Sequence, residues 1–288
     1  MKKWSYDLPY ITSKQKEIMR LIHKFRFLNR IQIQTLMKHK DYKRINVWLK
    51  DLAKKGYLYR IYERKIPLNI KPAVYFLAPT GVRFTRNLGN YDTNHKLYRE
   101  KERSEEFRSK CLLISNLYID ILKKTEPQNA LNFFKTKQDF DEYDEIIKPY
   151  PDGLLSLNVP PPDIINFLNN QTNPKSNINT GKKNKRKSKK EYLYFLELIG
   201  EKTPRYYLRY RIQQYIEYSD RHQATKPYPH VMFALPNEQT KIFLMKFVEN
   251  RLDETLFDSQ FIFFFTTIDV LENKGLFGKI WARIASKS

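Results

Sequence analysis

Two carboxylates stand at positions where they could do chemistry on a phosphodiester. Asp152 directly follows Pro151 at the start of an expected strand, and Glu197 lies inside the apolar segment Tyr194–Ile199. A carboxylate inside an apolar strand is costly unless it is paired, so Glu197 needs either a partner or a function. Two such groups on one sheet could hold Mg²⁺ or Mn²⁺, which would activate water and stabilise charge on the phosphate.

Metal-dependent nucleases of the Pro-Asp … Asp/Glu-x-Lys type also place a lysine two residues after the second carboxylate. Ile199 occupies that position here. A nearby cation would have to replace the lysine, and polar residues of the next segment would line the site: Lys202, Arg209 or Arg211 for the cation, and Gln213, Gln214 and Tyr215 for the lining. The alternative is that Asp152 caps a turn and Glu197 pairs with Arg209 or Arg211 without a metal. The missing lysine favours a domain that binds DNA or protein without cleavage.

Other cofactor chemistry has little support. The single cysteine, Cys111, lies among aliphatic residues and is expected to be a buried structural thiol. The five histidines show no metal-ligand spacing, and the eight glycines form no phosphate-binding loop. No cofactor is therefore expected, except Mg²⁺ or Mn²⁺ if the chain is a nuclease.

The first ninety residues hold most of the positive charge of the chain. They contain 21 Lys and Arg against 5 Asp and Glu, whereas the whole chain has a formal net charge of +22. A basic surplus on a small helical unit is typical of proteins that neutralise phosphates. Neither a signal peptide nor an apolar run of membrane-spanning length is visible, so we expect a cytoplasmic protein without a membrane partner.

Three helices are predicted in this basic region. Thr12 with Gln15 forms a capping box before an apolar stripe that reaches Phe25, and Asn29 with Gln32 restarts the pattern. The third helix runs from about Tyr42 to Lys55 and ends at Gly56, which easily adopts a left-handed cap. Ile45, Trp48, Leu49 and Leu52 would point inward from this helix.

The outward face of the third helix carries side chains suited to DNA. Arg and Asn can bond to base edges, whereas Lys is better suited to phosphates. Two strands, 57–64 and 73–77, follow with a basic loop between them, and three helices plus a basic hairpin form a winged helix-turn-helix. The predicted DNA contacts are Lys43, Arg44, Asn46, Val47, Lys50 and Lys54 on the helix, and Arg64, Lys65 and Lys71 in the loop.

The pattern of apolar segments in the second half of the chain predicts an α/β sheet. A polar segment, residues 87–96, marks the boundary between domains 1–90 and 97–288. A long amphipathic helix over 98–124 would either begin the second domain or form a dimer interface. Residues 166–190, with seven basic residues in the last nine, are expected to be a disordered insertion. The remaining elements are strands at 131–136, 153–158, 191–199, 230–235 and 260–267, and helices at 206–220 and 238–252.

Several segments resemble the replication-relaxation family, which comprises winged-helix proteins of plasmids and conjugative elements. In the first half these are Thr12–Phe27, the Leu-x-x-Leu-x-x-x-Gly-Tyr-Leu pattern that begins at Leu49, and Tyr75-Phe-Leu-Ala-Pro-Thr-Gly. In the second half they are Pro151-Asp-Gly-Leu-Leu, Phe195-Leu-Glu-Leu-Ile-Gly and Leu208-Arg-Tyr-Arg-Ile-Gln-Gln-Tyr. The resemblance covers nearly the whole chain outside the 166–190 insertion.

The resemblance implies an α+β winged helix-turn-helix followed by an α/β, restriction-endonuclease-like domain. It also implies a mobile-element protein that binds double-stranded DNA in replication, mobilisation or origin recognition, with relaxase or replication proteins as partners. Two alternatives stay open. One is a Mg²⁺-dependent nicking nuclease or relaxase that uses Asp152 and Glu197; the other is a homodimeric transcriptional regulator.

Overall fold

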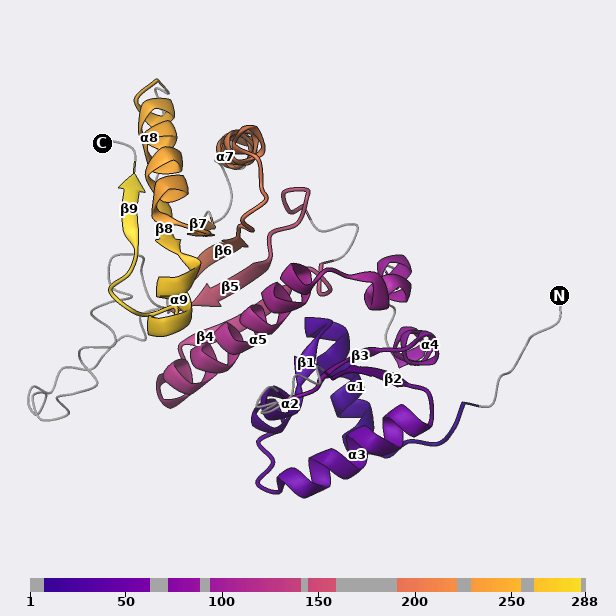
Figure 1. The fold of residues 1–288 in the computed structure, drawn as a ribbon. Coiled ribbons are helices and arrows are strands. Elements are labelled where there is room, and N and C mark those ends of the chain that lie inside the picture. Colours follow the sequence, from indigo (N-terminus) through magenta and orange to yellow (C-terminus); the bar gives the residue numbers. More distant parts are fainter. Residues whose placement is uncertain are drawn as a thin grey trace, which may run out of the picture. The chain divides into compact units, whose positions relative to one another are not determined.

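The computed structural model describes residues 8–62, 72–88, 94–140, 145–158, 191–221, 229–254 and 262–285. It is a mixed α+β structure whose contacts divide the chain into two compact units (Figure 1). The first comprises Met1–Ile119 and Gln138–Asp144, and the second comprises Asp120–Lys137 and Glu145–Ser288. None of the described helices is both long and apolar enough to span a membrane. The domain division predicted from the sequence stays a prediction.

The first unit combines helices with a small antiparallel sheet of strand order β1-β3-β2. Its helix starts follow from capping chemistry: the Thr12 hydroxyl accepts a bond from the Gln15 amide at 3.3 Å, and the Gln15 side chain accepts one from the Thr12 amide at 2.9 Å. Asn29 and Gln32 form the second predicted capping box. The elements are α1 (Ser13–Phe25), β1 (Leu28–Asn29), α2 (Arg30–Leu36), α3 (Tyr42–Lys54), β2 (Leu58–Ile61), β3 (Val74–Leu77) and α4 (Pro79–Leu88).

Two glycines shape the turns on either side of the small sheet. Gly56 follows α3 with φ = 74°, as the sequence predicts for a left-handed cap. Gly81, in the first turn of α4, lies against the backbone of Tyr57, where an added Cβ would stand 2.2 Å from the carbonyl oxygen. Any side chain at residue 81 would therefore push α4 away from the start of β2.

The long helix predicted over residues 98–124 is wrong at its beginning. A 3₁₀ helix, η1 (Asn94–Glu102), precedes a separate helix, α5 (Glu105–Thr125). The Ser104 hydroxyl accepts a bond from the Phe107 amide at 3.2 Å, so Ser104 starts a new helix whose first turn is acidic. The stripe on α5 that includes Cys111 and Leu117 is buried within this chain, and Cys111 forms no disulfide.

The second unit is a six-stranded sheet of order β4-β5-β6-β7-β8-β9. The first three strands are antiparallel neighbours, β6, β7 and β8 run parallel, and β9 is antiparallel to β8. The crossovers from β6 to β7 and from β7 to β8 contain α7 and α8, which pack beside each other. The elements are η2 (Glu126–Gln128), β4 (Leu131–Thr136), β5 (Gly153–Leu157), β6 (Tyr192–Leu198), α7 (Arg205–Arg221), β7 (His230–Leu235), α8 (Glu238–Glu254), β8 (Ile262–Thr267), α9 (Ile268–Lys274) and β9 (Ala282–Ala285).

The face of the sheet beneath α7 has an aromatic core. Phe233 on β7 and Phe265 on β8 are register neighbours, and their rings stack with centroids 5.8 Å apart. Tyr215 of α7 packs edge-on against Phe233 at 5.9 Å. Offset and edge-on aromatic contacts of this kind stabilise a sheet beyond the area that they bury. The two carboxylates of interest lie at the end of this aromatic row.

Candidate nucleic-acid interface and carboxylate site

The helix α3 has one apolar and one cationic face. The Asp41 carboxylate caps it by accepting a bond from the Lys43 amide at 2.7 Å. Ile45, Leu49 and Leu52 are fully buried, as the spacing predicts, whereas Trp48, which was also predicted to point inward, is only partly buried. The helical residues predicted to contact DNA all lie on the exposed side: Lys43, Arg44, Asn46, Val47, Lys50 and Lys54.

The acidic residue of α3 does not compete with this cationic face. Asp51 accepts a bond from the Gln15 side chain at 2.7 Å and pairs with Lys55 at the same distance. The bond to Lys55 is the largest of the interactions that lower the pKa of the Asp51 carboxyl. These bonds hold the carboxylate beside Gln15 and Lys55, and attraction to Lys54 on the outward face makes a smaller contribution to the lowered pKa.

Aromatic residues extend this surface beyond the predicted set. Tyr42 is 50% exposed and stacks with the guanidinium of Arg30, whose Cζ lies 5.6 Å from the ring centroid. Tyr59 on β2 and Tyr62 just after it are also about half exposed, and the exposed Arg60 lies between them in the sequence. The sequence prediction missed these residues because it selected residues on the third helix and in the basic loop without considering exposed tyrosines. Arginines next to tyrosines in the sequence could have indicated these residues, because a guanidinium can stack on a tyrosine ring.

Part of the predicted interface lies outside the described residues. These are the loop residues Arg64, Lys65 and Lys71 and the lysine-rich insertion 166–190. Their role in contacting phosphates stays a prediction.

In the second unit, the two carboxylates fall in one row across three strands. Thr136 on β4 is opposite Gly153 on β5, and Gly153 is opposite Leu196 on β6. Because both strand pairs are antiparallel, the next row contains Lys137, Asp152 and Glu197. Side chains in one row point to the same face, so the three charged groups are brought together.

Asp152 is held by a cation and by the backbone of the next strand. Its side chain is 2% exposed, and one carboxylate oxygen lies 2.7 Å from the Lys137 Nζ. The other oxygen accepts a bond from the Leu198 amide at 2.8 Å. The alternative in which Asp152 caps a turn therefore needs correction: the carboxylate links β5 to β6 because it faces the end of the neighbouring strand.

Glu197 forms an ion pair with Arg211, one of the two arginines that the sequence analysis proposed as its partner. Its Oε1 accepts bonds from the Arg211 Nε at 2.8 Å and Nη2 at 2.5 Å. The Tyr215 hydroxyl donates to the same oxygen at 2.5 Å. Arg211 is 2% exposed and Glu197 6%, so this pair is buried under α7. Lys202 and Arg209, the other two candidates, are exposed.

The ionisation of this cluster follows from its burial and its pairing. Burial alone would lower the pKa of the Lys137 ammonium, but Asp152 and Glu197 outweigh burial and raise that pKa. Burial alone would also lower the pKa of the Arg211 guanidinium. The neighbouring Glu197 carboxylate outweighs burial, so this pKa is raised. Burial raises the pKa of the Tyr215 hydroxyl well above its ordinary value. The cluster thus contains two cations, two carboxylates and a neutral phenol that donates a hydrogen bond.

The cluster does not fit a divalent metal in this arrangement. Among the residues that the structure describes, no group of three or more His, Cys, Asp or Glu side chains lies together. Each carboxylate is matched by its own cation, and Glu197 Oε1 already accepts three bonds. A metal at this site would also lie beside two buried cations, Lys137 and Arg211, and their positive charge would oppose its binding.

Lys137 is the residue that the sequence prediction missed. It immediately follows β4, whereas Asp152 immediately precedes β5. Two strands joined as an antiparallel pair place such residues opposite each other, so the signal lay in the symmetric ends of the two predicted strands.

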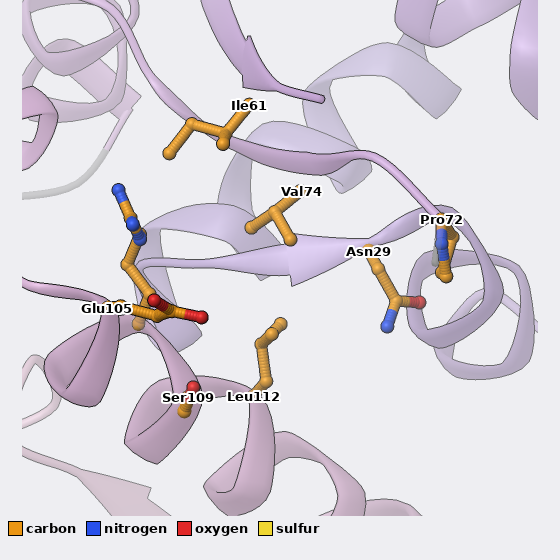
Figure 2. Close-up of a pocket in the computed structure, with 8 residues that line it drawn as sticks. Asn29, Ile61, Pro72, Val74, Glu105, Ser109 and Leu112 are labelled. Atoms are coloured by element: carbon orange, nitrogen blue, oxygen red, sulfur yellow. The ribbon is translucent and has the colours of Figure 1, made fainter. Parts of the chain in front are cut away.

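A separate cavity of about 280 Å³ lies in the first unit, between the ends of β2 and β3 and the first turns of α5 (Figure 2). Figure 2 shows Ile61 and Val74 on one side of the cavity, and Glu105, Ser109 and Leu112 of α5 on the other. This volume is at the lower end of small-molecule sites. The lining residues are Asn29, Ile61, Pro72, Val74, Glu105, Arg108, Ser109 and Leu112.

The sequence and fold can be compared with known proteins at this point. Residues 19–229 match the replication-relaxation family. The chain belongs to this family, which confirms the resemblance in its sequence. A comparison with curated protein sequences finds no match. A solved structure, that of the transcriptional regulator SlyA, aligns with 40% of this chain and 75% of its own at 15% identity, with a TM-score of 0.24. So low a score carries no argument about the fold.

Proposed function

We propose that this protein binds double-stranded DNA, with α3 entering the major groove. The observation that carries the proposal is the outward face of α3, where three lysines, an arginine and an asparagine are all exposed. The opposite face of the same helix is fully buried, so the cationic side chains project from a rigid support. A helix of this kind matches the width of the major groove.

The architecture of the first unit supports a winged helix-turn-helix. Its order is α1, β1, α2, α3, β2, β3, with an antiparallel sheet in which β3 lies between β1 and β2. In this class the helix before the β-hairpin is the recognition helix, and the hairpin contacts the adjacent backbone. The restriction-endonuclease-like nature of the second unit is part of the same proposal, supported by the two carboxylates on neighbouring strands.

The side chains of α3 divide into two roles. Arg44 and Asn46 have the planar donor groups that bond to guanine or adenine edges, and they would give sequence preference. Lys43, Lys50 and Lys54 would neutralise phosphates and fix the register of the helix. Membership of the replication-relaxation family supports a role in plasmid replication, mobilisation or origin recognition, with a relaxase or replication protein as partner.

The test is the double variant Lys43→Ala, Arg44→Ala, assayed by gel shift on a duplex selected from a random pool. We expect its affinity to fall by about tenfold to hundredfold, because one base contact and one phosphate contact are removed. The slope of the logarithm of affinity against the logarithm of salt concentration should also decrease in magnitude by about one unit, because one phosphate contact is lost.

The matched control is Lys246→Ala, Arg251→Ala, which removes the same charge from exposed positions on α8. If both double variants lose the same small amount of affinity, binding depends on total charge and α3 is not the recognition helix. If neither variant changes the affinity, the interface lies elsewhere.

A Mg²⁺-dependent nuclease is the second candidate function. The observation in its favour is the row that joins Asp152, Glu197 and a lysine, Lys137, on one face of the sheet. The pairing of Glu197 with Arg211 stands against it. We therefore rank DNA binding without cleavage first.

A further inference from the structure

The helix α7 has an outward face that the carboxylate cluster does not use. Its inward residues Leu208, Ile212 and Tyr215 are fully buried, together with Arg211. The first two turns of α7 also carry exposed arginines and tyrosines that flank the buried side or lie opposite it: Arg205, Tyr206, Arg209 and Tyr210. We call this group the Arg-Tyr face.

The tyrosines of the Arg-Tyr face are unusually open to solvent. Tyr206 is 69% exposed and Tyr210 is 59% exposed. They are four residues apart on a helix, so their Cβ atoms are about 5–6 Å apart and both rings leave the same surface. Two large exposed rings on one helix surface are placed so that a planar ligand could cover both.

The charge around these rings is positive. Arg205 and Arg209 form a second i, i+4 pair directly beside the two tyrosines, and Lys202 is exposed in the preceding turn. The Arg205 guanidinium is steadied by Phe243 of α8, with its Cζ 4.8 Å from the ring centroid. The exposed acids nearby are Glu201 in the same turn and Glu217 two turns further along. The face therefore has an excess of cations next to its aromatic rings.

We propose that the Arg-Tyr face binds single-stranded DNA. Tyrosine rings stack on bases and arginines bind phosphates, and alternation of the two along a surface suits a strand whose bases and phosphates also alternate. A duplex cannot use the rings, because its bases are already stacked on one another. An unstacked strand exposes the base faces. The proposal goes beyond duplex recognition by α3 and does not depend on it, since the two surfaces belong to different units.

The direct test measures the anisotropy of a fluorescent oligothymidine of about twelve nucleotides, a length within the range that one binding module covers. The double variant Tyr206→Ala, Tyr210→Ala of the full chain should bind it about a hundredfold more weakly, about tenfold for each ring lost. The variant Tyr206→Phe, Tyr210→Phe keeps the rings and should stay within about threefold of the parent. Tyr10→Ala, which removes a tyrosine that is 80% exposed in the other unit, is the matched control.

A second measurement uses the unchanged protein and removes the bases. An abasic oligonucleotide of the same length has the same phosphates, so loss of stacking should weaken its binding as much as the alanine variant does. The alanine variant should bind normal and abasic strands equally. If oligothymidine affinity is the same for the parent, the alanine variant and the Tyr10→Ala control, the proposal is overturned and the face is left for a protein partner.

The same set of proteins separates this proposal from duplex recognition. The alanine variant should keep the parent's affinity for the selected duplex, and Lys43→Ala, Arg44→Ala should keep the parent's affinity for oligothymidine. Loss of duplex binding in the second variant alone supports α3, whatever happens at α7. Equal loss of both ligands in the tyrosine variant contradicts a separate single-strand site.

Discussion

Breaking the buried pair between Glu197 and Arg211 should destabilise the second unit more than removing the pair entirely. Three variants test this: Glu197→Leu, Arg211→Met, and the two combined. With Lys137 and Asp152 the cluster contains two positive and two negative groups. Each single substitution leaves one uncompensated buried charge, whereas the double substitution leaves the neutral Lys137–Asp152 pair.

The magnitude follows from the burial of the two side chains, 2% exposed for Arg211 and 8% for Glu197. Removal of one partner from a buried pair costs about 3–5 kcal/mol in the free energy of unfolding, whereas replacement of both by apolar residues is often nearly neutral. The Tyr215 hydroxyl also loses its acceptor whenever Glu197 is replaced, which adds about 1–3 kcal/mol. Because this Tyr215 loss is common to Glu197→Leu and the double variant, we expect the double variant to be more stable than Glu197→Leu by about 3–5 kcal/mol, the cost of the uncompensated charge.

The assay is urea unfolding followed by the fluorescence of Trp281. This residue belongs to the second unit, and its indole donates to the Leu276 carbonyl at 2.7 Å. Trp4→Phe and Trp48→Phe in the parent background remove the other two tryptophans, so the signal reports the second unit rather than an average. A loss of several kcal/mol is a large fraction of the about 5–15 kcal/mol that stabilises a domain.

The refuting result is additivity. If the loss in the double variant equals the sum of the two single losses, the groups do not interact and the cluster is not an ion pair in solution. If Glu197→Leu alone is neutral, the carboxylate is not buried. Stabilisation by Glu197→Leu would contradict the pairing more directly, because a protein tolerates an uncompensated acid only where that acid has a separate function.

The remaining predictions concern pH and cleavage. His230 is buried, its Nδ1 has no hydrogen-bond partner among the described residues, and burial lowers its pKa to about 4. Since this value lies below the unfolded pKa of about 6.5, the stability of the second unit should be complete above pH 6.5 and should fall by about 3 kcal/mol as the pH drops to 4. His230→Leu should flatten that decline in urea titrations at several pH values, and an unchanged slope would refute the assignment. Supercoiled plasmid incubated with Mg²⁺ or Mn²⁺ should stay intact; nicking that disappears in both Asp152→Asn and Glu197→Gln would instead favour the nuclease.

Local chemistry made much of the fold predictable. The two capping boxes, the left-handed Gly56 and the apolar spacing of α3 each depend on residues within a few positions of one another, and all are confirmed. The strands β4 and β7 begin and end at the predicted residues. The fully buried β7 has a nearly continuous apolar sequence, as buried parallel strands do. The exposure of the cationic residues of α3 follows from the same periodicity.

The features that could not be predicted from the sequence are very short elements and contacts between residues far apart in the chain. The prediction included neither α9 nor β9, which have 7 and 4 residues and depend on neighbouring strands for their stability. The break before α5 was missed because a single serine cap outweighed an apolar stripe that continues across it. Lys137 was missed because its partner Asp152 is fifteen positions away, and only strand pairing brings them together.

The distribution of paired and unpaired charge bears on the choice between binding and cleavage. Glu100, 1% exposed, is bonded to Arg26, and Asp152 and Glu197 are bonded to Lys137 and Arg211. These buried acids are each balanced by a cation, so the net charge of +22 must appear at the surface. Two of the places where it appears are helix faces, α3 and the start of α7, each with a buried opposite side. A nuclease needs acids that remain free to hold a cation, whereas a nucleic-acid-binding protein needs basic groups that remain free to hold phosphates. The paired acids and exposed basic residues in the described part of this chain therefore support the proposed DNA binding over the alternative of a nuclease.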